Sequence, residues 1–569
     1  MAQEVLTDAT FHRMKKKYAQ YTDILFLLFL LALTFALYWP ALRIFFSLDD
    51  LQFLSRAAGL TDDTGGLRRL ISTRVFFAAS WRLFGSRPWP YHLVVLLLHA
   101  ANASIIYFLA RRLNLKKTAA YAASILFVTT YVAFLPMHWI SGIQEVSVAF
   151  FALISAYCFL GRTTVSGAIS LVAACLSMLC KETSFLLLPA FALVLPVSAK
   201  RRWVLGSAGL VFGLAILALS GSLAPRPAAD PYESSFGANM LWNLLTYSAW
   251  LFRFWDYFPD RLPQYNASMA GWGLIMPILI CLAAWRVPRA REPIAKAVLL
   301  FIFAIMPVLP LVRHSYFYYL YLPLIPFWLL AGAYVGNISR RSLSAVILAL
   351  FILHSFVNGM RHRKAELQEG VPEDPILRYA AAAEIAVTSF RAEGEIKRGD
   401  YLILIPLNAK TIDLTKGLDT AVQSQRVSFA LVEQALLGGK ALRLFFPAME
   451  NIYFEDQASY VPGWQRMHLY MTYHLGMMKS LGYGEEGRFT LARYSAQKGL
   501  YEQAKRELLI MLELEPNNPA LLYALGDVAS KQGDTERLNA ILERLEHIAR
   551  SENPPGAARR ALNKLKQMQ

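Results

Sequence analysis

Two adjacent carboxylates follow the first long apolar segment of the chain. Asp49 and Asp50 lie in the stretch FFSLDDLQF, directly after the apolar run 21–40. An ionised carboxylate is costly to remove from water, so a pair beside a membrane must face water, a cavity or a cation. Such a group can deprotonate a hydroxyl or bind a metal ion. The alternative is a loop pair that is solvated where a helix leaves the bilayer and caps the next helix.

A second charged pair joins two apolar runs with almost no loop between them. Lys181 and Glu182 lie between runs 165–180 and 183–199. A tight hairpin needs a polar residue at its tip, which explains one charge. Charged pairs at a membrane boundary are also typical of binding sites and pathways. Both interpretations stay open.

The loop MHWISGIQEV carries two further candidates, His138 and Glu145. They could take part in proton transfer or in a hydrogen-bond network. The simpler interpretation is that Trp139 anchors the chain at the membrane interface and Glu145 lies in the first turn of a helix.

A basic and aromatic stretch, LVRHSYFYY, predicts an anion site. Arg313 can clamp a phosphate, and His314 and Tyr316 can add hydrogen bonds. An aromatic belt at the interface explains the tyrosines but not the two basic residues. By contrast, His92 and His99 are seven residues apart on one helical face and are interpreted as polar packing groups, not metal ligands.

The elements that position these residues are membrane spans. The chain has 569 residues, of which 56% are hydrophobic and 17% are charged. This composition and the repeated apolar runs predict an all-α polytopic membrane domain. The net charge of +17 lies largely in short clusters between the runs, where it orients helices, so it does not indicate nucleic acid.

About eleven spans are predicted, with the N-terminus in the cytoplasm. The basic residues that precede the first run and those between later runs then all fall on the cytoplasmic side. Asp49, Asp50 and everything beyond residue 360 fall outside the cytoplasm. The predicted spans are 22–40, 91–110, 119–137, 144–161, 165–180, 183–199, 203–221, 267–285, 296–312, 318–336 and 342–358.

Two segments on the outer side are predicted to be amphipathic helices in the membrane interface. Residues 66–90 and 238–262 both mix arginines with aromatic residues. The second segment could be a twelfth span, but that topology would put the later basic clusters on the wrong side.

The pattern predicts three parts, at 1–360, 361–486 and 487–569. The middle part contains the apolar runs 401–406 and 441–447, which suit buried strands of a connecting α/β domain. In the last part, a pattern containing Ala492 and Gly499 recurs 34 residues later at Gly526 and Gly533. This period is typical of tetratricopeptide repeats, which form an α-helical solenoid and dock protein partners.

Taken in order, these stretches resemble the GT-C superfamily of polyisoprenyl-phosphate-sugar glycosyltransferases. The resemblance is closest to the transmembrane-and-tetratricopeptide O-mannosyltransferases and their bacterial relatives. It covers residues 1–358 and 487–569. The matching stretches are LDD at 48–50, HL at 92–93, HAAN at 99–102, RRL at 111–113, PMHWISG at 136–142, LCKE at 179–182 and YLYLP at 319–323.

The resemblance implies that an acceptor hydroxyl attacks the anomeric carbon of a polyprenyl-phosphate sugar outside the cytoplasm, with inversion. Asp49 or Asp50 would be the base, or would bind a divalent metal ion. Lys181, Arg313, His314 and Tyr316 would hold the donor phosphate. His138, Glu145 and Glu182 would face the acceptor or support the site, with Glu182 either paired with Lys181 or directed to the acceptor.

The predicted function is therefore sugar transfer from this lipid to a protein or glycan. A bacterial inner membrane is expected, with the soluble region in the periplasm. The alternatives are an oligosaccharide polymerase or ligase and a non-catalytic scaffold built on the repeats. Transport is disfavoured because the charges gather at one face instead of along a path through the bilayer.

Overall fold

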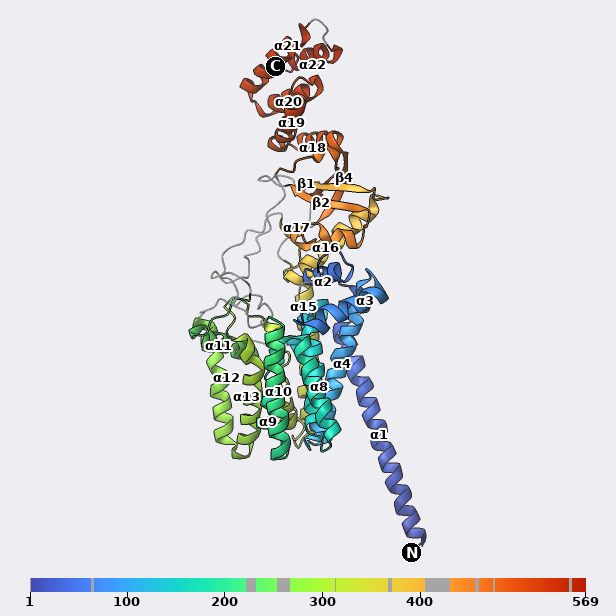
Figure 1. Ribbon diagram of the computed structural model, residues 1–569, viewed down its shortest axis with the longest axis vertical. Helices are drawn as coiled ribbons and strands as arrows, with labels where there is room; N and C mark the ends of the chain where they lie inside the picture. Colours follow the sequence, from blue (N-terminus) through green and yellow to red (C-terminus); the bar gives the residue numbers. More distant parts are fainter. Residues whose placement is uncertain are drawn as a thin grey trace. The chain divides into compact units, whose positions relative to one another are not determined.

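The fold was obtained as a computed structural model. It describes residues 2–62, 66–221, 232–252, 267–312, 314–366, 371–404, 430–455, 460–473, 476–551 and 555–568. The described chain forms two compact units, one ending at Arg378 and the other beginning at Tyr379 (Figure 1). The three-part division at residues 360 and 486 stays a prediction.

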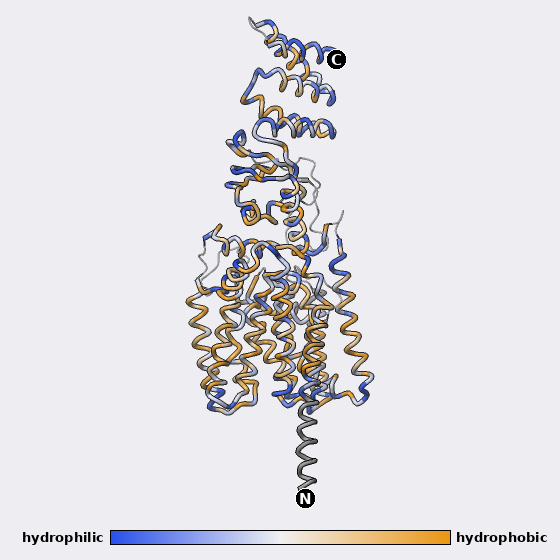
Figure 2. Tube along the Cα trace, turned by 90° about the vertical axis from the view of Figure 1, so that its right-hand side faces the viewer, coloured by the Kyte–Doolittle hydropathy of each residue, from blue (hydrophilic) through white to orange (hydrophobic). Residues whose placement is uncertain are grey.

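The first unit is a bundle of apolar helices (Figure 2). Every predicted span overlaps a helix or a helix pair. These are α1 (Ala2–Tyr38), α4 (Pro88–Arg112), α5 (Lys117–Val128) with α6 (Phe134–His138), α7 (Ile143–Phe159), α8 (Thr164–Cys180), α9 (Leu187–Val194), α10 (Ala199–Leu219), α12 (Ala267–Arg286), α13 (Arg291–Ile305), α14 (Ile325–Val335) and α15 (Arg341–Lys364).

Length and composition identify fewer candidate spans than eleven. Among the described residues, five helices are long and apolar enough to cross a membrane, or six if the bent pair α5 and α6 forms one span. The first unit is thus consistent with a helical membrane protein, and the count of eleven stays a prediction.

Small residues allow the helices of this bundle to approach closely. A Cβ atom added at Gly332 of α14 would lie 2.5 Å from the backbone nitrogen of Ala123 in α5. Between α7 and α8, the hydroxyls of Ser155 and Ser170 each donate to the other residue's carbonyl, at 2.8 and 2.9 Å. Close packing and hydrogen bonds of this kind hold helices together in lipid.

Shorter helices lie toward one end of the bundle (Figure 1). The predicted interface segment 66–90 is not one continuous helix. It forms a π-helical turn, η2 (Leu70–Val75), then α3 (Phe76–Phe84), and then the start of α4. Gly85, with φ +58°, breaks the path between α3 and α4. Of the segment 238–262, α11 (Ala238–Phe252) is a helix, and residues 253–262 lie outside the described residues.

The second unit contains a four-stranded mixed sheet in the middle part of the chain, where the sequence predicts buried strands of a connecting α/β domain. The strand order is β2-β1-β3-β4, with β1 parallel to β2 and β3, and β3 antiparallel to β4. The strands are β1 (Gly399–Leu404), β2 (Met449–Glu455), β3 (His468–Tyr473) and β4 (Met477–Tyr483), and the accompanying helices are α16 (Pro375–Ala392) and α17 (Ala430–Ala435).

One of the two predicted strands is confirmed and the other is wrong. The run 401–406 forms the end of β1 as far as Leu404, and residues 405–406 lie outside the described residues. The run 441–447 instead begins as a short 3-10 helix, Lys440–Leu444. Gly438 and Gly439 precede it with φ of +63° and +87°. This left-handed turn starts a helical path, in which Ala441, Leu442 and Leu444 are buried without strand alternation.

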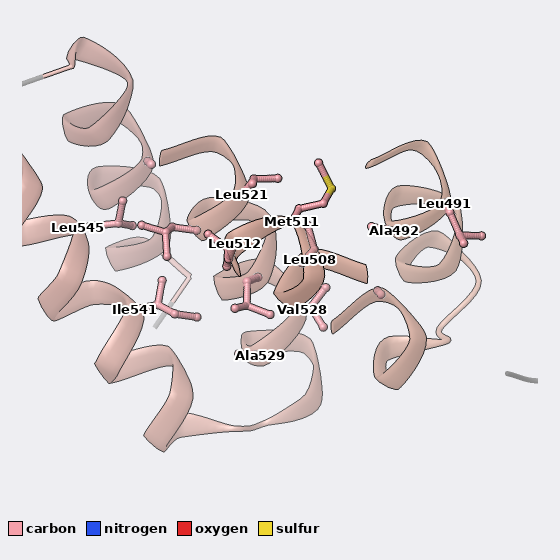
Figure 3. Packing of buried hydrophobic residues seen from close by; sticks show 14 of the residues in the cluster. Leu491, Ala492, Leu508, Met511, Leu512, Leu521, Val528, Ala529, Ile541 and Leu545 are labelled. Atoms are coloured by element: carbon pink, nitrogen blue, oxygen red, sulfur yellow. The ribbon is translucent and has the colours of Figure 1, made fainter. Parts of the chain in front are cut away.

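Five helices follow the sheet, namely α18 (Gly484–Gln497), α19 (Tyr501–Leu514), α20 (Pro519–Gln532), α21 (Thr535–Ala549) and α22 (Gly556–Lys566). Their apolar faces form a continuous core (Figure 3). Gly499 and Gly533 both end a helix with φ +73°, as expected of the turns in a helical repeat. The tetratricopeptide assignment itself stays a prediction.

Candidate active site

The two adjacent aspartates occupy different environments at the start of α2 (Asp49–Ala57). Asp50 is buried, with 1% of its surface exposed. Its Oδ2 accepts the backbone N–H of Ser47 at 3.0 Å. Its Oδ1 accepts the backbone N–H of Ser141 at 2.7 Å and the Ser141 hydroxyl at 2.5 Å. Both oxygens of Asp50 are therefore engaged.

Asp49 is half-buried and makes no side-chain hydrogen bond or ion pair within the described part of the chain. Burial raises the pKa of its carboxyl group, while the positive charges of Arg69 and Lys181 oppose that rise. Burial likewise raises the pKa of Asp50 to about 7, against its three hydrogen bonds. Asp49 is thus the carboxylate that is left available for a ligand.

Two arginines near η2 gather around Glu182. Arg69 binds both carboxylate oxygens, with Nε 3.0 Å from Oε2 and Nη2 2.8 Å from Oε1. Arg68 reaches the same Oε1 at 3.4 Å. Tyr232 lies against both arginines, because its hydroxyl accepts Nη1 of Arg69 at 3.2 Å and its ring lies 4.8 Å from the Arg68 guanidinium. Fork-shaped binding of this kind orients an arginine firmly.

Lys181 forms a buried ion pair with Glu145, and each side chain is 4% exposed. The Lys181 ammonium also lies 4.2 Å from the ring centre of Tyr319 and 5.3 Å from that of Tyr318. Burial lowers the pKa of Lys181, and the carboxylate of Glu145 opposes this shift. The pair explains why two charged residues are tolerated in an apolar surrounding.

The predicted phosphate stretch contributes an aromatic row. The ring of His314 lies 4.3 Å from that of Tyr232 and 4.5 Å from that of Tyr316. Burial and the neighbouring charges of Lys181 and Arg69 lower the pKa of His314 to about 3, so its imidazole is neutral. Arg313 lies outside the described residues.

His138 does not join this cluster through any described contact. Its Nδ1 lies 2.8 Å from the carbonyl oxygen of Phe134, and its ring stacks on the Phe134 ring. The other two histidines also contact neighbouring segments, since Nδ1 of His92 lies 3.3 Å from the Met137 carbonyl and Nδ1 of His99 lies 2.6 Å from the Tyr321 hydroxyl. All three resemble packing groups.

The structure therefore connects most of the predicted site residues through direct contacts or through the fields of Arg69 and Lys181. The connected residues are Asp49, Glu145, Lys181, Glu182, His314 and Tyr316. The sequence reasoning missed Arg68, Arg69, Ser141 and Tyr232. For the two arginines a signal was present, because they lie on the predicted outer side against the usual bias of positive charge.

Comparison with known proteins gives one finding. Residues 73–223 match the family model described as dolichyl-phosphate-mannose-protein mannosyltransferase. This match supports the GT-C superfamily. No curated protein matches the chain. Together with the apolar helices, the match indicates an integral membrane protein with a glycosyltransferase domain of the mannosyltransferase type.

The matched segment contains part of the site. Ser141, Glu145, Lys181 and Glu182 lie inside it, and Asp49 precedes it. The site is thus drawn from the matched segment and from residues on both sides of it.

The carboxylates of this site do not fit a divalent metal ion. Asp50 accepts three hydrogen bonds, Glu182 is bound by Arg69, and Glu145 is bound by Lys181. Asp49 would therefore have to bind the ion as the only free carboxylate of this group, beside two positive charges. Among the described residues, no group of three or more His, Cys, Asp or Glu side chains is placed to hold a metal. The prediction that Asp49 or Asp50 binds a metal gains no support from this donor set.

Proposed function

We propose that this chain is a GT-C type glycosyltransferase that moves one sugar from a polyprenyl phosphate to a hydroxyl acceptor, with inversion at the anomeric carbon. The observation that carries the proposal is the Asp49 carboxylate, which has no hydrogen bond or ion pair among the described residues and lies in the electrostatic field of Arg69 and Lys181. Inverting transfer needs a base beside the acceptor and cations beside the leaving phosphate. The family match to residues 73–223 supports the same reaction class.

Asp49 is the proposed base. The acceptor hydroxyl gives its proton to the Asp49 carboxylate as its oxygen forms a bond to the anomeric carbon. A base acts best when its pKa lies near the working pH, and burial raises the pKa of Asp49 in that direction. Asp50 is not chosen, because its oxygens already accept hydrogen bonds from Ser47 and Ser141.

Cations are proposed to stabilise the polyprenyl phosphate that leaves. The bond between the anomeric carbon and the phosphate oxygen breaks, and the polyprenyl phosphate leaves with the added negative charge. Arg68 and Arg69 are the proposed phosphate ligands, with Lys181 close to them. Arg68 has the weaker contact with Glu182, at 3.4 Å, and its Nε has no hydrogen-bond partner in the described chain. Of the predicted phosphate ligands, His314, Tyr316 and Arg313 are proposed to complete this side.

The remaining parts of the proposal concern placement. We assign the N-terminus to the cytoplasm, the eleven helical segments to spans, and the second unit to the outer side, which in a bacterial inner membrane is the periplasm. The acceptor is a protein or a glycan, and the helical repeats bind a protein partner. The dolichyl-phosphate-mannose family description favours a polyprenyl-phosphate mannose donor and a protein acceptor.

The test is transfer of radiolabelled sugar from a panel of polyprenyl-phosphate sugars by the purified full-length protein. Wild type is compared with Asp49→Asn, Arg68→Ala and the distant control Ser155→Ala. Loss of the base should lower turnover by about 10²–10⁴-fold. Loss of Arg68 should raise the donor KM, and the control should match wild type. An Asp49→Asn protein that is folded and fully active would refute the proposal.

A further inference from the structure

One buried carboxylate joins two segments that are far apart in the sequence. Asp50 accepts hydrogen bonds from Ser47, three residues away, and from Ser141, 91 residues away. We call this group of Ser47, Asp50 and Ser141 the Asp50 staple. Asp50 and both serines are buried, with 1% of each residue exposed. Hydrogen bonds to a charged acceptor that water cannot reach are strong and directional.

The staple fixes the start of α2. Asp49 and Asp50 are the first two residues of this helix, and Leu48 before them has φ +32°, which is rare for a residue with a branched side chain. A conformation of this kind persists only where surrounding contacts enforce it. The bond from Ser47 to Asp50 closes the turn around Leu48, so it helps to set the direction of the Asp49 side chain.

The other half of the staple fixes the start of α7. Ser141 lies in the 3-10 turn Ile140–Gly142, which leads directly into α7, and Glu145 lies in the first turn of that helix. The turn has little room to move, because a Cβ added at Gly142 would lie 2.5 Å from the Cα of Pro136. Glu145 in turn binds Lys181.

We propose that Asp50 and Ser141 are positioning residues, which hold Asp49 and the Glu145–Lys181 pair in the positions that sugar transfer requires. This inference rests on the proposed function. It assigns the two adjacent aspartates different tasks, since Asp49 reacts and Asp50 orients. Positioning of this kind affects turnover more than affinity, because small displacements of a reacting group reduce rate steeply.

The first experiment removes one hydroxyl. Ser141→Ala and Ser141→Thr are compared in full-length protein, with radiolabelled polyprenyl-phosphate mannose as the probe, at saturating donor and at varied donor. Ser155→Ala is the matched control, because it also removes a buried hydroxyl that bonds across two elements. We expect Ser141→Ala to lower kcat by about 10-fold or more with an unchanged donor KM. Ser141→Thr, which keeps the hydroxyl, should restore most of the turnover.

A purely structural role gives a different result. If Ser141→Ala behaves like the Ser155→Ala control in kcat, or if the donor KM rises while kcat is unchanged, the positioning role is wrong. Melting temperatures of the three variants are measured alongside, so that a loss of folded protein is not mistaken for a loss of rate.

The second experiment separates the two aspartates and also decides the proposal if Ser141→Ala does not fold. Asp50→Asn keeps an oxygen for Ser141 but turns an amide N–H₂ toward the N–H of Ser47. We expect kcat to be about 10-fold lower than that of wild type. It should still decrease toward acidic pH, because the Asp49 carboxylate must still be ionised. Asp49→Asn should instead lose about 10²–10⁴-fold in turnover at every pH. If Asp50→Asn loses as much while folded, Asp50 is itself the reacting group and the inference fails.

Failure of the proposed function looks different. In that case Asp49→Asn would transfer sugar as well as wild type, or no polyprenyl-phosphate sugar would be used at all. Loss of activity in Asp49→Asn combined with control-like Ser141→Ala and fully active Asp50→Asn would refute only the positioning inference.

Discussion

At the residue scale, Asp49 and Asp50 are neighbours with different chemistry. Successive helical residues point about 100° apart, so the two side chains at the start of α2 face different surroundings. Asp50 meets three donors from Ser47 and Ser141. Among the described residues, the Asp49 side chain makes no hydrogen bond, and it lies in the fields of Arg69 and Lys181. The same residue type is therefore held by hydrogen bonds at one position and has none among the described residues at the next, and the proposed roles of the two aspartates rest on this difference.

The raised pKa values of these two carboxyl groups predict the pH dependence of activity. Both groups must be ionised for the proposed roles, and the pKa of Asp50 is raised to about 7. Activity should therefore rise with pH through neutrality and be lost as the pH falls below about 7. The measurement is kcat/KM against pH. An acidic limb near the ordinary carboxyl pKa of about 4 would contradict it.

The same shift has the opposite sign for stability. Between about pH 4 and 7 the folded protein binds more protons at Asp50 than the unfolded chain does, because its folded pKa is raised. The free energy of unfolding should therefore decrease as the pH rises through this window. Melting temperatures of wild type and Asp50→Asn across the window test this. Equal pH slopes in the two proteins would contradict it.

Arg69 should not be replaceable by lysine. It binds both oxygens of Glu182 and the Tyr232 hydroxyl through three nitrogen atoms. Lysine keeps the charge but not the planar fork. We expect Arg69→Lys to lower kcat/KM by about 10-fold, the equivalent of roughly 1.4 kcal/mol. Arg82→Lys on the exposed side of α3 is the matched control. Equal kcat/KM values in the two variants would count against the role of Arg69.

At the element scale, α5 and α14 pack closely against each other within the first unit. Gly332 leaves no space for a side chain against the backbone of Ala123, whereas Gly271 in α12 has no atom within 4 Å of an added Cβ. We therefore expect a side chain to be tolerated at Gly271 but not at Gly332.

Gly332→Ala should therefore destabilise the protein by about 1–3 kcal/mol, because the helices must separate to admit the methyl group. Gly271→Ala should have no such effect. The measurement is the thermal unfolding of both variants in the same detergent. A Gly332→Ala protein as stable as Gly271→Ala would show that α5 and α14 separate freely.

At the scale of the whole molecule, one buried cluster runs through the second unit, from the sheet into the helices that follow it. Its buried cluster joins side chains of β1, β3 and β4 with those of α18 to α22. At the junction, the buried Arg488 binds Glu455 at 2.7 Å and Glu507 at 2.5 Å, with its guanidinium 4.4 Å from the ring centre of Trp464. This links the end of β2 to α18 and α19.

Removal of Arg488 should therefore affect the whole second unit. Arg488→Met would leave Glu455 with its contact to Arg506 and Glu507 without its buried partner. We expect a loss of about 3–5 kcal/mol in stability. Protease should then cut both the sheet and the helices of the variant sooner than those of wild type. Arg493→Met, at an exposed position of α18, is the control. Cleavage confined to the helices would show that the sheet folds separately.

Local patterns in the sequence determined where most helices lie and which acidic pair is a candidate site. Apolar runs predicted the positions of the apolar helices of the first unit, and a 34-residue period predicted the paired helices with turns at Gly499 and Gly533. They also predicted the acidic pair of Asp49 and Asp50 as a candidate site. These features depend on residues within one or two helical turns of each other, which a sequence displays directly.

Only the tertiary structure shows which side chains the site residues contact. The choice between Asp49 and Asp50 depends on Ser141, which is 91 residues away from Asp50, and Arg69 reaches Glu182 across 113 residues. The run 441–447 was wrongly predicted to be a strand. Its apolar residues are buried in a short 3-10 helix that follows a left-handed turn. Contacts of this range arise from how whole elements pack, so no local pattern encodes them.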